Sequence, residues 1–144
     1  MKDYTQGCYP TGKVVVADTS AFITGIVRMA QGAIYTTNSV VSEVKDEHSR
    51  EVMETLISAG RLIIEDPGKQ YIELVRRIAA RIGTLEKLSE ADIEVLALSL
   101  LLRDKFECEV YVATDDYTLQ YTASHFNLKI LRMRYRGVRE RVYG

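Results

Sequence analysis

Short valine-rich runs alternate with stretches of helical periodicity along this chain, and the alternation constrains the fold more than any other feature. The runs expected to form strands are residues 13–18, 33–37, 61–66, 110–114 and 128–131. Strands that alternate with helices predict a parallel sheet, because each crossover helix packs back against a face of that sheet. We therefore predict an α/β fold: a three-layer α/β/α sandwich around a central, mostly parallel five-stranded sheet.

The intervening stretches carry apolar residues at helical spacing. Asp18 could cap the first helix, although Thr19 or Ser20 could do so instead and leave Asp18 free, and Asn38 or Ser39 could cap the second. Helices are expected at residues 19–32, 38–60 (as one helix or two), 69–83, 88–105 and 116–127.

The size and composition of the chain predict one domain over residues 1–144, with a basic segment at residues 132–144. Its 47% hydrophobic and 27% charged content is typical of a soluble globular protein. No apolar stretch approaches the roughly 20 residues that span a bilayer, and the first residues lack the apolar core of a signal peptide. We therefore expect a cytoplasmic protein without a membrane partner. Two cysteines are too few for a disulfide scaffold or a four-ligand zinc site.

The net charge of −1 conceals an uneven distribution. Residues 132–144 contain five arginines and one glutamate, a net charge of +4, so the other 131 residues carry −5. An acidic body with a basic segment fits a protein that binds a metal in one place and a polyanion in another. The alternative is that the arginines lie on a solvated terminal strand or tail and have no binding role. The candidate polyanion-binding residues are Arg132, Arg134, Arg136, Arg139 and Arg141.

Aspartates follow the two most strand-like runs, with Asp18 after one and Asp115 after the other. In an open α/β sheet, ligands bind beyond the carboxyl ends of the strands, where the strand order reverses. If these two strands are neighbours, Asp18 and Asp115 meet at that edge. Asp116 adds a second adjacent charge, which indicates either a solvated turn with a helix N-cap or a cation site.

Two further carboxylates have structural explanations as well as functional ones. Glu43 could point to solvent from its helix, and Asp92 could close a capping box with Ser89. However, no lysine or arginine lies within three residues of Asp18, Asp92 or Asp115, so converging carboxylates would repel one another. Mg²⁺ or Mn²⁺ would relieve this repulsion and could orient water for attack on phosphorus. Zinc is less favoured, because the histidines are isolated and the cysteines are far apart.

Four segments resemble, in order, the acidic segments of PIN-domain ribonucleases: "VVVADTSAFI", "SVVSEV", "LSEADIEVLAL" and "VYVATDDYTLQ". The resemblance covers nearly the whole chain. It implies a Mg²⁺- or Mn²⁺-dependent endonuclease that cleaves single-stranded RNA, which the arginines would bind. Carried over to this chain, the resemblance implies catalytic roles for Asp18, Glu43, Asp92 and Asp115. It implies that the metal is bound by Asp18, Asp92 and Asp115, with Asp116 as an accessory ligand. Residues that position these ligands or contact the substrate would be Thr19, Ser20 and Thr114.

Within the superfamily, "TNSVVSEVKD", "LSEADIEVLALSL" and "ATDDYTLQ" look most similar to the Nin-one-binding branch. That branch matures the 3′ end of small-subunit ribosomal RNA, which implies pre-rRNA as the substrate. Two features depart from it: a zinc ribbon cannot be built from two cysteines, and Tyr121 stands where asparagine is expected. The other candidate branch is the VapC toxins, which an antitoxin holds inactive and which fit in size. A homodimer stays open in both cases.

Three other classes fit less well. A phosphoacceptor receiver domain needs an acidic pair after the first strand and an aspartate after the third, whereas Asp66 meets the second condition only loosely. A haloacid-type phosphatase needs Asp-x-Asp after the first strand, and residue 20 is serine. A PIN fold that only binds RNA or a protein would not need to retain so many mutually repelling carboxylates.

Overall fold

The five strands in the described part of the chain lie parallel in one sheet, as the alternation predicts. The computed structural model describes residues 12–133. The strand order is β3-β2-β1-β4-β5, and every neighbouring pair is parallel. The strands are β1 (Lys13–Ala17), β2 (Ile34–Thr36), β3 (Leu62–Ile64), β4 (Glu109–Ala113) and β5 (Lys129–Leu131).

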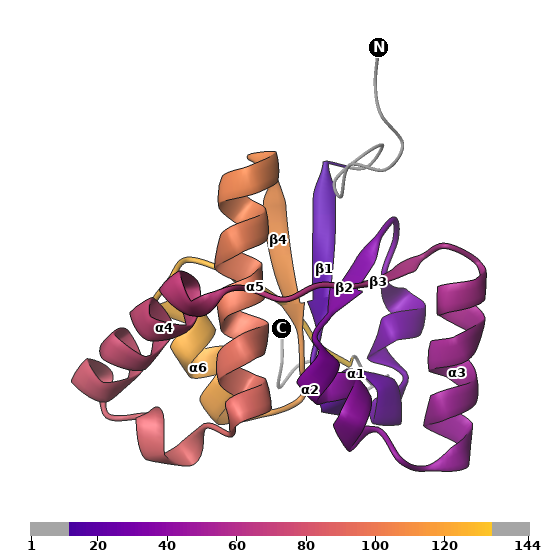
Figure 1. Cartoon of the computed structure of the whole chain (residues 1–144), viewed down its shortest axis with the longest axis horizontal. Helices are drawn as coiled ribbons and strands as arrows, with labels where there is room; N and C mark the ends of the chain where they lie inside the picture. Colours follow the sequence, from indigo (N-terminus) through magenta and orange to yellow (C-terminus); the bar gives the residue numbers. More distant parts are fainter. Residues whose placement is uncertain (1–11, 134–144) are drawn as a thin grey trace, which may run out of the picture.

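Helices cover both faces of this sheet (Figure 1). α4, α5 and α6 lie on one side of the strands, and α1 and α3 on the other. From β1 through β2 to β3 the chain moves toward one edge of the sheet, and it then crosses back to β4 and on to β5 at the other edge. Because the crossover connections are right-handed, this change of direction places the two helix groups on opposite faces of the sheet. The helices are α1 (Thr19–Thr24), α2 (Asn38–Glu43), α3 (Glu47–Ser58), α4 (Lys69–Ile82), α5 (Glu90–Phe106) and α6 (Tyr117–Ser124), with 3₁₀ turns η1 (Ile26–Met29) and η2 (Leu85–Lys87).

The order of the sheet reverses between β1 and β4, which are neighbours as predicted. Ala17 and Ala113 are register partners at the last position of the two strands. The Asp18 amide then donates to the Ala113 carbonyl at 3.1 Å, so the chain leaves both strands at the same level. The loop after β1 and the loop after β4 therefore start side by side at the carboxyl edge of the sheet.

Helix α5 forms the centre of one layer and explains the long apolar run in its sequence. Leu96, Leu98 and Leu102 are completely buried, and α5 packs against both β4 and β1. Its first turn reaches the carboxyl edge of the sheet, so packing along the rest of the helix fixes the position of Asp92. The core of the protein thus holds one of the predicted site residues in place.

The helix predicted over residues 19–32 is shorter in the structure. Gly25 adopts φ +88°, a left-handed conformation that glycine reaches without steric cost. Helix α1 therefore ends at Thr24, and the chain continues as η1. The predicted segment 38–60 forms two helices, α2 and α3, which was one of the two alternatives.

One predicted helix N-cap is wrong, and another is settled among its alternatives. The N-cap of α2 is Thr37, whose hydroxyl accepts from the Val40 amide at 3.3 Å, rather than Asn38 or Ser39. The N-cap of α1 is Asp18, which was one of the three residues considered for this role together with Thr19 and Ser20. Within residues 12–133, no helix is both long enough and apolar enough to cross a membrane.

Candidate active site

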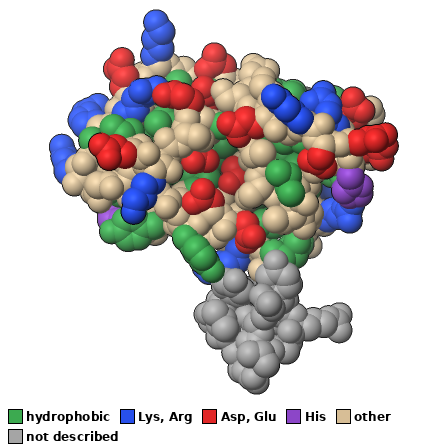
Figure 2. Space-filling view, turned by 90° about the horizontal axis from the view of Figure 1, so that it is seen from below, with side chains coloured by type: hydrophobic (Ala, Val, Ile, Leu, Met, Phe, Trp, Pro, Cys, Tyr) green, Lys and Arg blue, Asp and Glu red, His purple; other side chains and the backbone are tan. Residues whose placement is uncertain are grey.

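Acidic side chains gather near the middle of the face at the carboxyl ends of the strands. Figure 2 shows this face, with Asp and Glu side chains close together at its centre. Three connections converge there: β1 to α1, β4 to α6, and the turn that precedes α5. The topological switch point therefore coincides with a concentration of negative charge.

Asp18 is the most deeply placed of these carboxylates, with only 4% of its surface exposed. Its Oδ1 accepts hydrogen bonds from the Ser20 hydroxyl at 2.8 Å and from the Ala21 amide at 2.9 Å. Its Oδ2 accepts a hydrogen bond from the Thr114 hydroxyl. Asp18 therefore serves as the N-cap of α1 and also joins α1 to the end of β4.

Ser20 and Thr114 connect Asp18 to the two aspartates that follow β4. The Asp115 amide donates to the Ser20 hydroxyl at 2.9 Å, and the Asp116 amide donates to the Thr114 hydroxyl at 3.0 Å. Both hydroxyls in turn donate to the Asp18 carboxylate. The backbone at residues 115–116 is thus held at a fixed distance from Asp18 by two side-chain bridges.

Glu43 ends helix α2 and lies against the start of α1. The Thr19 hydroxyl donates to Glu43 Oε1 at 2.7 Å, and the Glu43 side chain is exposed. This hydrogen bond engages one carboxylate oxygen and leaves the other directed away from Thr19. Thr19 therefore positions Glu43 rather than capping α1.

Asp92 forms the predicted capping box at the start of α5. Its Oδ2 accepts from the Ser89 amide at 2.9 Å, while its own amide donates to the Ser89 hydroxyl at 3.1 Å. Asp92 therefore does have the structural role in a capping box that the sequence suggested as an alternative to a functional one. The capping box engages one oxygen of this half-buried carboxylate, so the other oxygen can still take a functional role.

Asp116 is the N-cap of α6, also as expected. Its Oδ1 accepts from the amides of Thr118 at 2.8 Å and Leu119 at 3.2 Å. Asp115 precedes it, and both side chains are exposed. Cap geometry fixes the direction of the Asp116 carboxylate, whereas the hydrogen bond found for Asp115 involves its amide and not its side chain.

Burial raises the pKa of the Asp18 carboxyl from 3.8 to about 6. Hydrogen bonds from Thr114, Ser20 and the Ala21 amide oppose this increase, and the charge of Asp92 adds to it. Burial also raises the pKa of Asp92, against the hydrogen bonds from Ser89.

The charges that further raise the pKa of Asp92 belong to Asp116 and Glu43. Asp18, Asp92, Asp116 and Glu43 therefore form one electrostatically coupled group, because each charge in it opposes ionisation of a neighbour.

Comparison with known proteins agrees with this geometry. The family model described as the PIN domain of ribonuclease matches residues 15–102. This chain belongs to the PIN-domain ribonuclease family. The match begins in β1 and ends in α5, so it includes Asp18, Glu43 and Asp92 of the coupled group.

Two similar proteins represent the two branches considered from the sequence. Ribonuclease VapC3 of Aeropyrum pernix is 47% identical over 138 residues, which are 95% of this chain and 99% of that protein. Endoribonuclease Nob1 of Pyrococcus abyssi is 40% identical over 126 residues, which are 88% of this chain and 71% of that protein. The predicted resemblance to PIN ribonucleases is confirmed.

PIN ribonucleases depend on divalent metal ions, and the donors present here fit such an ion. Asp92, Asp116 and Glu43 each use one carboxylate oxygen to hold the scaffold. In residues 12–133, no three acidic, histidine or cysteine side chains converge into a complete metal-binding cluster. Mg²⁺ does not require one, because it retains several waters and usually binds one or two carboxylates together with substrate phosphates.

A side-chain hydrogen bond that the sequence did not predict joins α2 to α5. The Ser39 hydroxyl donates to Glu94 Oε1 at 2.9 Å, in a half-buried position. This hydrogen bond fixes the helix that carries Glu43 relative to the helix that carries Asp92. The available signal was Glu94 itself, an acidic residue inside the otherwise apolar stretch "IEVLAL".

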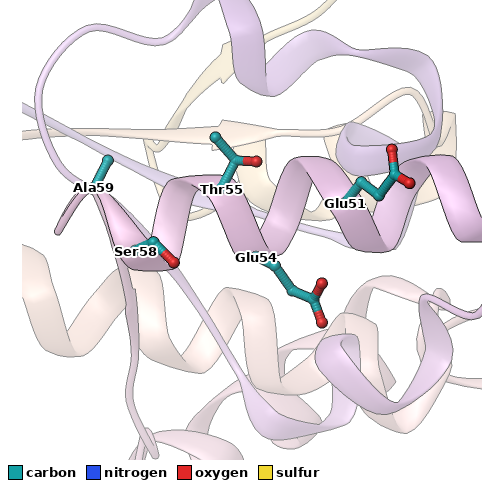
Figure 3. A pocket seen from close by; sticks show the side chains of 5 residues that line it. All are labelled: Glu51, Glu54, Thr55, Ser58 and Ala59. Atoms are coloured by element: carbon teal, nitrogen blue, oxygen red, sulfur yellow. The ribbon is translucent and has the colours of Figure 1, made fainter.

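A surface hollow on α3 lies apart from this site. Figure 3 shows its lining, which is Glu51, Glu54, Thr55, Ser58 and Ala59. These residues belong to one helix and the position directly after it, and none of them is a predicted site residue. Two glutamates make this hollow unsuitable for the phosphates of RNA.

The basic segment starts beside the PIN site. The Thr114 amide donates to the Leu131 carbonyl at 3.2 Å, so β5 ends next to the loop that carries Asp115 and Asp116. Arg132 follows directly and is half-buried. The other predicted RNA-binding residues, Arg134, Arg136, Arg139 and Arg141, lie outside the described residues.

The raised pKa of Asp18 predicts that the metal-free protein loses stability as the pH rises. In the folded state Asp18 keeps its proton up to about pH 6, whereas an unfolded chain loses it near 3.8. This group therefore stabilises the fold below pH 3.8, and its contribution is lost as the pH rises through about 6. The full effect is on the order of 3 kcal/mol at about 1.4 kcal/mol per pKa unit.

Urea denaturation in EDTA at pH 5 and pH 7 measures this effect, and Asp18→Asn is the control. The Asn variant should gain stability relative to the wild type between pH 5 and pH 7, because it has no proton to lose. An equal pH dependence in both proteins would show that Asp18 does not titrate in this range.

Proposed function

We propose that this protein is a Mg²⁺- or Mn²⁺-dependent endoribonuclease that cleaves single-stranded RNA at the carboxyl edge of its sheet. The observation that carries the proposal is Asp18, a buried carboxylate at the β1–β4 switch point whose ionisation is opposed by burial and by Asp92. Such a charge is costly to retain unless a cation meets it. The family of the chain and its similarity to endoribonucleases support the same reading.

In this proposal, the residues of the coupled group divide the work. Asp18, Asp92 and Asp116 would hold the cation, directly or through the waters that it retains, and Glu43 would accept a hydrogen bond or a proton from a water beside it. When bound, the cation lowers the pKa of water and neutralises charge at the phosphate. Ser20 and Thr114 keep Asp18 oriented, and Thr19 does the same for Glu43.

On sequence alone, Asp115 is the expected metal ligand and Asp116 the accessory one. We now propose the reverse ranking. The carboxylate of Asp116 is directed by the cap of α6, and its charge acts on Asp92. Asp115 would then contact the substrate or a metal-bound water at the margin of the site.

A circular single-stranded RNA tests the reaction class, because it has no end for an exonuclease. We expect purified protein to linearise the circle in Mn²⁺ or Mg²⁺ and to leave it intact in EDTA. A duplex of the same sequence is the control and should be cut far more slowly. An intact circle in Mn²⁺, with a linear RNA degraded from its end, would contradict endonuclease activity.

For the biological substrate we propose the 3′ end of precursor small-subunit ribosomal RNA. The relatives named endoribonuclease Nob1 from Pyrococcus abyssi and Methanothermobacter thermautotrophicus, at 40% and 38% identity, support this choice. A short precursor RNA that spans the mature 3′ end should be cut at one position, whereas scrambled RNA of equal length should not. Scattered cuts in both RNAs would exclude this substrate.

The second candidate function is a VapC-type toxin with an antitoxin partner. The observation in its favour is the match to ribonuclease VapC3, which covers 99% of that protein. A toxin should arrest growth when it is expressed alone in a bacterial host, and the arrest should disappear in Asp18→Asn. Normal growth with active protein, together with one specific cut in precursor rRNA, would favour maturation.

The basic segment should contribute to RNA affinity but not to the chemistry. Deleting residues 134–144 removes four arginines and leaves β5 intact, since this strand ends at Leu131. Because each lost phosphate contact lowers the salt slope of single-strand binding by about 0.7, we expect a decrease of up to about 2 to 3. Filter binding in EDTA at several salt concentrations measures the slope. An unchanged slope in the folded deletion would remove this segment from the RNA-binding surface.

A further inference from the structure

A row of aromatic rings runs along one face of α6, directly beside the candidate active site. Tyr117 and Tyr121 are 68% and 53% exposed, a large exposure for aromatic side chains. They lie four residues apart, as do Tyr121 and His125, so the three rings occupy one face of the helix. We name Tyr117, Tyr121 and His125 the aromatic ridge.

The aromatic ridge starts at the site itself. Asp116 is the N-cap of α6 and Tyr117 is the first residue of that helix. Figure 1 shows α6 beginning near the carboxyl edge of the sheet and running away from that edge behind α4 and α5. A polymer whose backbone reaches the carboxylates would therefore meet Tyr117 first and Tyr121 next.

The ring at the middle of the ridge is held in place. The Tyr121 and His125 rings meet edge to face, with centroids 4.7 Å apart and an interplanar angle of 68°. This contact restricts the Tyr121 ring while more than half of the side chain stays exposed. A ring that is already ordered loses less conformational entropy when a ligand stacks on it.

Helix α6 carries no charged side chain that would repel a polyanion. The helix sequence, YTLQYTAS, contains no acidic residue. By contrast, α3 carries Glu47, Glu51 and Glu54, two of which are visible in Figure 3. An RNA strand that leaves the acidic site would be repelled along α3 and not along α6.

We propose that the aromatic ridge is a stacking platform for the bases of single-stranded RNA next to the cleaved phosphodiester bond. This inference rests on the proposed ribonuclease function and adds the path of the substrate. Residues four apart in a helix are separated by about 6 Å along its axis, more than the ~3.4 Å rise of a stacked duplex strand. The ridge therefore receives an extended strand, with separate bases on Tyr117 and Tyr121.

Alanine and phenylalanine substitutions at the two tyrosines test the platform. The measurement is anisotropy of a labelled 12-nucleotide RNA in EDTA, so that binding is observed without cleavage. Tyr117→Ala and Tyr121→Ala should each weaken binding about fivefold or more, the scale of one lost base–aromatic stack. Tyr117→Phe and Tyr121→Phe keep the ring and should stay within about twofold of the wild type. Ile57→Ala, at an exposed apolar residue of α3, is the matched control and should bind normally.

Two further measurements separate stacking from charge and from folding. The salt slope of binding should not change in the alanine variants, because no ionic contact is lost. In Mn²⁺, these variants should raise KM and leave kcat unchanged, and an abasic oligonucleotide should bind the wild type and the variants equally. Circular dichroism establishes that each variant is folded.

Several results would overturn the platform. Unchanged RNA affinity in folded alanine variants would do so and would leave the ridge as a surface for a protein partner. Equal losses in the alanine and phenylalanine variants would show a role for the hydroxyls instead. If the wild type cleaves RNA normally while either of these results is found, only the platform is rejected and the ribonuclease proposal stands. If RNA binding depends on the aromatic ridge but the wild type does not cleave RNA, only the ribonuclease proposal is rejected.

Discussion

Replacing Asp18 with asparagine should reduce metal-dependent RNA cleavage by about 100-fold or more, the scale for losing a group that stabilises charge in the transition state. The substitution keeps the size of the side chain and its role as N-cap, since asparagine and aspartate cap equally well. With Oδ1 kept at the cap, the amide nitrogen of asparagine takes the place of Oδ2 and cannot accept the hydrogen bond that the Thr114 hydroxyl donates there. It removes the negative charge that faces Asp92. The defect should therefore appear in kcat, with RNA binding in EDTA unchanged.

The same variant should be at least as stable as the wild type at pH 7 without metal. Removing the charge ends both the burial penalty on Asp18 and the repulsion with Asp92. Asp46→Asn is the matched control, because Asp46 is the N-cap of α3, accepts from the Ser49 amide at 2.9 Å and is not a site residue. Thermal melts and cleavage rates of both variants decide the outcome. If Asp18→Asn is folded and remains fully active, Asp18 is a structural cap and no more.

The second large effect is expected for Asp116→Asn, with a loss of cleavage of about 10-fold to 100-fold. Asparagine preserves the cap of α6, so the loss would come from the missing charge next to Asp92. Asp115→Asn is the natural comparison, because it changes the neighbouring residue in the same way. We expect it to cost much less activity.

The outcome for this pair also settles which aspartate after β4 faces the cation. A dead Asp115→Asn together with an active Asp116→Asn would restore the ranking expected from the sequence. Two fully active variants would remove the end of β4 from the metal site. Each protein is assayed with the same single-stranded RNA in Mn²⁺, and a melt of each variant excludes misfolding.

Much of the fold was predictable because local patterns and long-range topology agree. Buried parallel strands are short continuous apolar runs, and "KVVVA" and "VYVA" match the cores of β1 and β4. The switch-point rule then brings Asp18 next to the end of β4 without any knowledge of side-chain contacts. The capping box of Ser89 and Asp92 was visible for a similar reason, since it depends only on a spacing of three residues.

The details that the sequence did not predict depend on choices between adjacent residues. Thr37, Asn38 and Ser39 are all good caps, and the backbone conformation decides that Thr37 takes the position. The cap of α6 was easier, since the helix expected from residue 116 already assigned Asp116 to its start.

Contacts between distant segments were equally hidden. The hydrogen bond from Ser39 to Glu94 joins residues 55 positions apart, and no periodicity signals such a pair. The two hydroxyl bridges from Ser20 and Thr114 to Asp18 depend in the same way on how the loops meet. Residue types indicated which groups could take part, whereas the three-dimensional structure was needed to show how they are paired.

A Mn²⁺ titration of the metal-free protein tests the central claim most directly, with the RNA cleavage rate and the melting temperature measured on the same samples. If the carboxylates around Asp18 hold the catalytic cation, both quantities should rise and saturate over the same range of Mn²⁺ concentration. Both responses should be absent in Asp18→Asn and present in Asp46→Asn. Cleavage that persists in EDTA, or that responds to Mn²⁺ equally in Asp18→Asn, would contradict a metal site at Asp18.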